Sequence, residues 1–323
     1  STKKYKIERL AELNFDSTNG TEGVEDMEIR VLQYFLTIAR EQSISGAAEF
    51  LHITQPTLSR QMKELEEELG KQLFIRGNRK ITLTDDGMLL RKRAEEIIQL
   101  VEKTESEMNA DTTEFSGDIY IGGGETKGMR IITRAISKAQ SEHPLLKFHL
   151  FSGNAEDVTD RLDKGLLDFG VLVEPTNMSK YDFIKLPTKD IWGVLMRKES
   201  PMAVLESITP KDLRDKPVIC SNQLLVKNEI AGWLGGNERS LNIVTSYNLL
   251  YNASLLVEEN SHYALCLDGI IHTGESSDLC FRPLEPRLEV GLHFVWKKYQ
   301  VFSKASDYFL RLVQEEAQRQ VDR

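Results

Sequence analysis

The sequence has few cysteines and no long apolar run. Its 323 residues include Cys220, Cys266 and Cys280, which form no C-x-x-C pair and no spacing typical of a metal site. This argues against a disulfide framework and favours a reducing cytoplasm, with structural thiols or, as an alternative, a redox pair of Cys266 with Cys280. No apolar segment approaches about 18 residues and no signal peptide is recognisable, so we expect a cytoplasmic protein that does not contact a membrane.

Common catalytic signatures are also missing. The six histidines are scattered, without an H-x-x-x-H pair, and no nucleophile elbow is present. The segment GGGETKG, residues 122–128, follows a predicted strand and opens a predicted helix, as a nucleotide-binding loop would. However, its glycines do not follow G-x-G-x-x-G, it lacks G-K-[ST], and no acidic residue ends the next strand. We predict no catalytic residue, no metal site and no cofactor; a nucleotide-binding α/β enzyme is the alternative.

Positive charge is in deficit, with 41 Lys and Arg against 50 Asp and Glu and a net charge of −9. This argues against a protein that coats nucleic acid without selectivity. A small basic DNA-binding domain on an otherwise acidic protein remains compatible with this net charge, because the distribution of charge matters more than the sum. Residues 60–80 carry only a slight excess of cations, so a DNA contact there would depend on placement and on pairing of two copies.

The clearest pattern is residues 44–74, ISGAAEFLHITQPTLSRQMKELEEELGKQLF. It predicts two short helices joined by a tight turn, with Ser45 capping the first helix, Thr54 capping the second and Pro56 in its first turn. Apolar residues recur at helical spacing on one face of the second helix, and polar residues on the other face can bond base edges and phosphates. The pattern favours a helix-turn-helix; a helical hairpin with a polar outer face is the alternative.

Three further elements belong to this part of the chain. Residues 28–41 predict a supporting helix. Two apolar runs, residues 73–75 and 81–83, flank a turn at 77–78 and predict a hairpin with a cationic tip, the wing of a winged helix-turn-helix. Residues 85–108 predict a long helix capped by Thr84, whose heptad spacing indicates a seam between two copies. A single amphipathic helix packed on its own domain is the alternative. The seam residues are Leu90, Ala94, Ile97, Val101, Thr104 and Met108.

Beyond a linker at residues 110–117 the sequence pattern changes and predicts alternating strands and helices. Strands are predicted at residues 118–121, 147–151, 168–173, 192–196, 217–221, 242–246, 263–267 and 288–296. This is α/β patterning with parallel strands in two lobes, and the final helix, residues 303–319, is expected to pack on the first lobe.

Residues 27–108 resemble the N-terminal part of the LysR-type transcriptional regulators. The shared positions are Phe35, Ala39, Ser43, Ala47, Ala48, Leu51, Gln55, Pro56, Ser59, Leu65, Glu66, Leu69, Gly70, Leu73, Phe74, Arg76, Leu83, Thr84 and Gly87. The second half resembles the family's effector-binding domain by layout. The resemblance implies a winged helix-turn-helix, a linker helix that pairs subunits, a two-lobed domain with a periplasmic-binding-protein-like fold, and commonly a tetramer. The first 26 residues and the glycine run in GGGETKG depart from the family pattern.

The resemblance also implies two sites. The expected DNA-binding residues are Ser43, Ser45, Gln55, Pro56, Thr57, Ser59, Arg60, Lys63, Arg76, Arg79 and Lys80. A ligand in a two-lobed sheet protein lies at the carboxyl ends of the strands. The expected effector-binding residues follow predicted strands there and are Glu125, Thr126, Lys127, Ser152, Asn154, Glu174, Ser221, Asn222, Tyr247 and Asn248. An anionic ligand is favoured by a helix start after the first strand, although Glu125 and Glu174 could equally select a cation.

The sequence therefore predicts a regulator that reads promoter DNA as a homodimer or homotetramer and senses a small-molecule coinducer. RNA polymerase is an expected further partner, and a stand-alone ligand-binding protein is a second alternative. The expected divisions are an unassigned extension at 1–26, a DNA-binding domain at 27–84, a linker helix at 85–109 and an effector-binding domain at 116–323. Within the last, one lobe covers about 116–187 and 285–323, and the other about 188–284.

Overall fold

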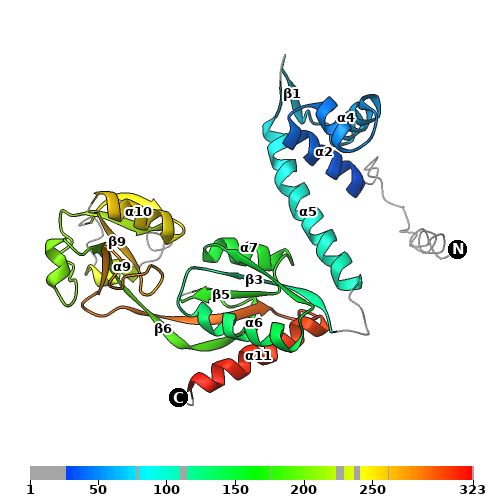
Figure 1. Cartoon of the computed structure of the whole chain (residues 1–323). Coiled ribbons are helices and arrows are strands. Elements are labelled where there is room, and N and C mark those ends of the chain that lie inside the picture. Colours follow the sequence, from blue (N-terminus) through cyan, green and yellow to red (C-terminus); the bar gives the residue numbers. More distant parts are fainter. Residues whose placement is uncertain are drawn as a thin grey trace. The chain divides into compact units, whose positions relative to one another are not determined.

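A computed structural model of the chain describes its fold over seven ranges and divides it into two compact units at the Val101–Glu102 junction (Figure 1). The described ranges are residues 27–77, 80–109, 115–174, 176–222, 229–235, 241–260 and 262–321. The predicted extension at 1–26 lies outside them. Within these ranges, no helix combines the length and the apolar character needed to cross a membrane.

The first unit begins with three helices, α2 (Ile29–Glu41), α3 (Ile44–Phe50) and α4 (Gln55–Leu69). Their apolar faces share one core, in which Phe35 and Leu58 are fully buried. The apolar positions repeat at the helical period in each segment, so burying them against one another holds the helices together. The two-helix pattern predicted from residues 44–74 is confirmed.

The helix starts are fixed by side-chain caps. Thr54 accepts a hydrogen bond from the Thr57 backbone N–H at 3.4 Å and caps α4, as predicted. The predicted cap of α3 is wrong: Ser43 accepts from the Gly46 N–H at 3.2 Å, while Ser45 lies inside the helix. The helix begins two residues earlier than a Ser45 cap implies, because an extended Ser43 can present its hydroxyl to the first turn.

The predicted wing is a two-stranded antiparallel hairpin, β1 (Phe74–Arg76) and β2 (Ile81–Leu83). Glu66 joins the wing to α4, because its carboxylate accepts from the backbone N–H groups of Leu73 at 2.7 Å and Phe74 at 3.2 Å. Residues 78–79 at the turn lie outside the described residues.

Helix α5 (Asp85–Asn109) follows the wing directly. Thr84 accepts from the Gly87 N–H at 3.0 Å, which confirms the predicted cap. A Cβ at Gly87 would lie 2.2 Å from the Leu73 carbonyl oxygen, so only glycine allows the helix to start this close to the wing. The first turns of α5 pack on the helical core through Leu90 and Ala94.

The second unit is built on a nine-stranded sheet in the order β4-β3-β5-β11-β6-β9-β7-β8, with β10 also paired to β6. The strands are β3 (Gly117–Gly123), β4 (Leu146–Ser152), β5 (Phe169–Val173), β6 (Tyr181–Arg197), β7 (Pro217–Ser221), β8 (Asn242–Tyr247), β9 (Tyr263–Leu267), β10 (Leu279–Pro283) and β11 (Glu289–Lys297). Helices α6 (Met129–Glu142), α7 (Ala155–Asp163) and α11 (Lys304–Val321) accompany the first lobe, and η1 (Pro201–Val204), α9 (Glu229–Trp233) and α10 (Leu250–Asn260) the second.

The prediction of a parallel sheet is only half right. Strands β3, β4 and β5 run parallel, as do β7, β8 and β9, but β11 and β6 pair antiparallel with each other and with their neighbours. These two long strands pass from one lobe to the other. Charged residues and Pro187 interrupt the apolar pattern of β6, so only its last part was predicted, and β10 was missed. The predicted lobe boundary at 187/188 falls inside β6.

Helices cover both faces of the first lobe. Figure 1 shows α6 and α11 side by side along one face, and α7 on the other. Phe309 and Leu312 of α11 share a core with Ile119 of β3 and Ile132 of α6, which confirms the predicted packing of the last helix. The carboxyl ends of the parallel strands of both lobes therefore lie close together.

Candidate functional site: a DNA-reading helix and an interlobe pocket

The exposed face of α4 carries five of the eleven predicted DNA-binding side chains. Gln55, Pro56, Thr57, Arg60 and Lys63 are exposed, whereas Leu58, Met62 and Leu65 on the opposite face are buried. Ser59 is half-buried. One side of the helix is therefore available to a groove while the other is fixed to the core, as in a recognition helix.

Both cationic side chains of this face, Arg60 and Lys63, form ion pairs with acidic residues one turn further along α4. Arg60 lies 3.6 Å from Glu64, and Lys63 lies 3.1 Å from Glu67. All four side chains are solvent-exposed, so each pair contributes little to stability and can exchange for a phosphate.

The other predicted DNA-binding residues lie around this helix. Ser45 and Lys80 are exposed, and Ser43 is occupied as the cap of α3. Arg79 and the side chain of Arg76 lie outside the described residues.

Some residues of the predicted seam of α5 are buried within the protein, and others are exposed. Ala94 is fully buried and Leu90 half-buried against the helical core, so Ala94 is not available to a second copy. Val101 is half-buried, and Thr104 is exposed. Two predicted seam residues, Ile97 and Met108, are exposed, and they form an apolar row with two residues that were not predicted, Leu89 and Leu100. The exposed fractions of Leu89, Ile97, Leu100 and Met108 are 58%, 38%, 41% and 81%. At 3.6 residues per turn these four side chains fall within an arc of about 100°.

A pocket lies between the two lobes of the second unit. The space between its walls measures about 740 Å³, open solvent at its mouth included, which is in the usual range for a small-molecule site. It is lined by Gly124, Glu125, Gly153, Asn154, Ala155, Val171, Leu172, Val173, Glu174, Trp192, Ser221, Tyr247, Asn248, Leu249, Leu250, Leu267 and Ile270. The carboxyl ends of β3, β4, β5, β7 and β8 all contribute, which is where the sequence predicted a ligand site.

Six predicted effector-binding residues line this pocket: Glu125, Asn154, Glu174, Ser221, Tyr247 and Asn248. Four others do not. Ser152 and Asn222 are exposed outside it, Lys127 forms an ion pair with Asp268, and Thr126 is buried. The apolar wall, including Trp192 and Leu267, was not predicted as a site, because buried strand residues carry the same signal whether they face a core or a cavity.

Thr126 has a structural role beside the pocket. Its hydroxyl donates to Asp190 of β6 and accepts from the Gly128 N–H at 3.0 Å, next to the start of α6. Asp190 is fully buried, and burial raises the pKa of this carboxyl to about 6 in spite of the hydrogen bond from Thr126. The Asp268 charge raises the pKa further, while Lys127 lowers it.

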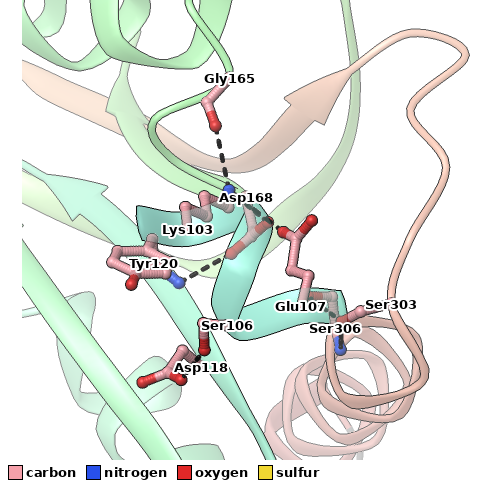
Figure 2. Close-up of polar contacts among 9 residues, drawn as sticks. All are labelled: Lys103, Ser106, Glu107, Asp118, Tyr120, Gly165, Asp168, Ser303 and Ser306. Atoms are coloured by element: carbon pink, nitrogen blue, oxygen red, sulfur yellow. Dashed lines mark hydrogen bonds and ion pairs between the residues drawn. The ribbon is translucent and has the colours of Figure 1, made fainter. Parts of the chain in front are cut away.

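A buried ion pair fixes the last turns of α5 to the first lobe (Figure 2). The Lys103 ammonium donates to Asp168 at 2.8 Å and to the Gly165 carbonyl at 3.1 Å, and both charged side chains are more than nine-tenths buried. The other oxygen of Asp168 accepts from the Tyr120 N–H at 2.8 Å. Burial raises the pKa of Glu107, 4.0 Å from Lys103, although the lysine charge opposes this.

A second group of contacts adds to this joint. The Ser106 hydroxyl donates to Asp118, whose other oxygen lies 2.7 Å from Nε2 of His149. Burial works against ionisation of Asp118, but the hydrogen bonds from His149 and Ser106 outweigh it and lower its pKa. Two successive turns of α5 are therefore tied to β3 and its neighbours by polar contacts.

Comparison with known proteins agrees with this architecture. The family model described as "Bacterial regulatory helix-turn-helix protein, lysR family" matches residues 29–88, and the one described as "LysR substrate binding domain" matches residues 112–318. Among curated relatives, the uncharacterized HTH-type transcriptional regulator YvbU of Bacillus subtilis is 32% identical over 60% of this chain. The HTH-type transcriptional regulator BsdA of the same organism is 34% identical over 51%. The chain spans less than two thirds of the length of these two relatives, because the alignments cover 65% and 56% of them.

A solved structure of full-length CbnR complexed with its target DNA resembles the fold. It is 17% identical, with a TM-score of 0.70 over 90% of this chain and 100% of that one. The substrate-binding-domain match alone spans more than half of the sequence, and the helix-turn-helix match precedes it in the expected order. The chain therefore belongs to the LysR family of bacterial helix-turn-helix regulators.

Proposed function

We propose that this protein is a ligand-responsive transcriptional regulator that binds promoter DNA through α4 and the wing. The observation that carries the proposal is the two-sided character of α4. Its polar face is exposed beside a hairpin, while its apolar face is fixed in the core. Polar side chains at the start of such a helix can read base edges in a major groove, and Lys80 can lie along the flanking phosphates.

Two copies of α4 and its wing are needed for tight binding to promoter DNA. The chain has a net charge of −9, and Arg60 and Lys63 each have an acidic partner, so one copy offers few uncompensated cations. We propose that the exposed row of Leu89, Ile97, Leu100 and Met108 on α5 pairs with the same row of a second copy. Burying such a row supports dimerisation, and pairs of dimers would form the tetramer that is common in the family.

We propose that the pocket is the effector site. The strands β6 and β11, which cross between the lobes, are proposed to move when a ligand binds. A ligand that contacts both lobes favours the arrangement in which they are closed. The joint at Lys103 supports transmission of that change, because it ties the end of the linker helix to the first lobe. RNA polymerase contact would follow from the altered DNA complex.

The test is binding of the full-length protein to the DNA upstream of its own gene and of the neighbouring divergent gene, measured by fluorescence anisotropy against salt. Arg60→Ala should weaken binding by about 1–3 kcal/mol if it contacts a base, and Lys63→Ala should reduce the salt slope by about 1 if it contacts a phosphate. Lys211→Ala, an exposed charge loss in the second unit, is the matched control and should change neither quantity.

Unchanged affinity and salt slope in both α4 variants would show that this face does not read DNA. A protein that binds no promoter DNA at all, but still binds small molecules, would instead be a stand-alone ligand-binding protein.

A further inference from the structure

Among the described residues that line the interlobe pocket, the charged side chains are of one sign. These are Glu125 and Glu174, and the described part of the lining includes no lysine, arginine or histidine. This feature bears on the class of ligand, provided that the pocket is the effector site proposed above. Two carboxylates facing one cavity disfavour a ligand that carries its own negative charge.

Nearby helix starts are not open to an anionic ligand, because oxygen atoms of the chain already cap them. Glu125 accepts from the Leu250 N–H at the start of α10, and Asn248 accepts from the Leu249 N–H at 2.9 Å. Asn154 accepts from the first N–H groups of α7 at 2.9 and 3.0 Å. An anion would have to displace these caps before it could use the helix ends. The start of α6, on which the sequence argument for an anion rested, is occupied as well: the Gly128 N–H donates to the Thr126 hydroxyl at 3.0 Å, and the Met129 N–H donates to the Thr126 carbonyl at 3.2 Å. The anionic ligand favoured from the sequence therefore loses its physical basis.

The neighbours of Glu174 leave its charge largely in place. Nε2 of His293 lies 3.3 Å from the carboxylate, but burial lowers the pKa of this histidine and so favours its neutral form. Glu174 also approaches Lys185 at 3.5 Å, and that lysine is 62% exposed, so solvent screens the pair. The Gly291 N–H donates to Glu174 at 3.2 Å and holds it in position.

The rest of the lining offers unused polar groups and aromatic surface. Ser221 is only 8% exposed, and its hydroxyl has no hydrogen-bond partner among the residues that the structure describes. Trp192 is 7% exposed, and its indole N–H is likewise unpaired within those ranges. The Tyr247 hydroxyl already donates to the Leu265 carbonyl at 2.7 Å, so this residue offers ring surface rather than a hydroxyl. Aromatic rings attract cations, which adds to the preference set by the carboxylates.

We propose that the interlobe pocket takes an organic cation, a small amine whose ammonium group is held by Glu125 and Glu174 while its apolar part lies against Trp192 and Leu267. The hydroxyl of Ser221 accepts or donates a hydrogen bond to the same ligand. In this arrangement the ligand contacts the first lobe through the two carboxylates and the second through Ser221. The charge pair therefore selects the ligand, and its contacts together with that of Ser221 join the lobes around it.

The test uses matched pairs of probes that differ in charge but keep their skeletons: 3-phenylpropylamine with 3-phenylpropionate, and 1,5-diaminopentane with glutarate. Binding to the full-length protein is measured by isothermal titration calorimetry at pH 7.5. The amine of at least one pair should bind, and its carboxylate partner should not. Glu125→Gln and Glu174→Gln should each weaken amine binding roughly tenfold or more, because each removes a charged hydrogen-bond partner. Glu259→Gln, on the exposed end of α10, is the matched control and should leave binding unchanged.

Both glutamine variants keep an oxygen that can accept from Leu250 or Gly291, so the backbone contacts survive. If Glu125→Gln does not fold, as judged by circular dichroism, Glu174→Gln decides the test alone. A carboxylate that binds as tightly as its amine, amine binding that no variant weakens, or no amine binding at all overturns the proposal.

The DNA assay separates this inference from the proposed function. Absence of DNA binding in the unaltered protein would refute the regulator function, while calorimetry would still decide the charge preference of the pocket.

Discussion

Replacing Lys103 by Met tests whether the buried ion pair holds the end of α5 on the effector-binding domain. The substitution keeps a long side chain of good helix propensity and removes only the ammonium group. Asp168 would then be left as a buried carboxylate with the Tyr120 N–H as its remaining donor, and the Gly165 carbonyl would lose the ammonium donor. Removal of one partner from a buried pair costs about 3–5 kcal/mol, far more than the pair contributes over an apolar replacement.

The assay is native-state hydrogen exchange, which reads the free energy of local opening for each segment separately. Amides in residues 102–109 should lose protection in Lys103→Met by an amount equivalent to about 3 kcal/mol or more, provided that this segment opens by a local route. Amides in α2 to α4 should not change, because they belong to the other unit. Lys92→Met, an exposed lysine of the same helix, is the control and should stay within about 0.5 kcal/mol.

The double variant Lys103→Met, Asp168→Asn supplies the refuting result. An asparagine can still accept from the Tyr120 N–H but carries no charge, so the double variant should recover at least about 1 kcal/mol relative to Lys103→Met. If Lys103→Met costs less than about 1 kcal/mol, or if Asp168→Asn recovers nothing, the helix end is held by packing and not by the charges.

Two further predictions concern Asp190 of β6, one of the strands that cross between the lobes, and the proposed dimer. The folded protein keeps the Asp190 proton up to about pH 6, whereas the unfolded carboxyl releases it near pH 4, so stability should fall as pH rises between these values. Asp190→Asn should remove this dependence and raise stability above pH 6 by up to about 3 kcal/mol, measured by urea unfolding at pH 4.5 and 7.5; greater stability of the unaltered protein at pH 7.5 would contradict the reasoning. Leu100→Glu should weaken dimerisation at least about tenfold in sedimentation velocity, because it places a charge in the proposed interface. Lys92→Glu, off the exposed row, should leave the association constant unchanged.

The sequence by itself determined the elements whose causes are local. Thr54 and Thr84 cap helices within three residues of themselves, and the apolar repeat of α4 fixes which face is buried. The wing follows from two short apolar runs around a turn. Such signals depend on neighbours in the chain, so they can be read without a fold. The strand ends that meet at the pocket also follow, because parallel strands bring their carboxyl ends to one edge.

The tertiary structure decided what individual side chains contact. Glu125 and Thr126 are adjacent in sequence, yet Glu125 caps α10 of the second lobe and lines the pocket, while Thr126 is buried against Asp190 of β6. Likewise, the apolar row of α5 that stays exposed depends on which residues pack against the helical core, and Ala94 is one of them. Both outcomes depend on partners that are distant in sequence, so no local pattern contains them.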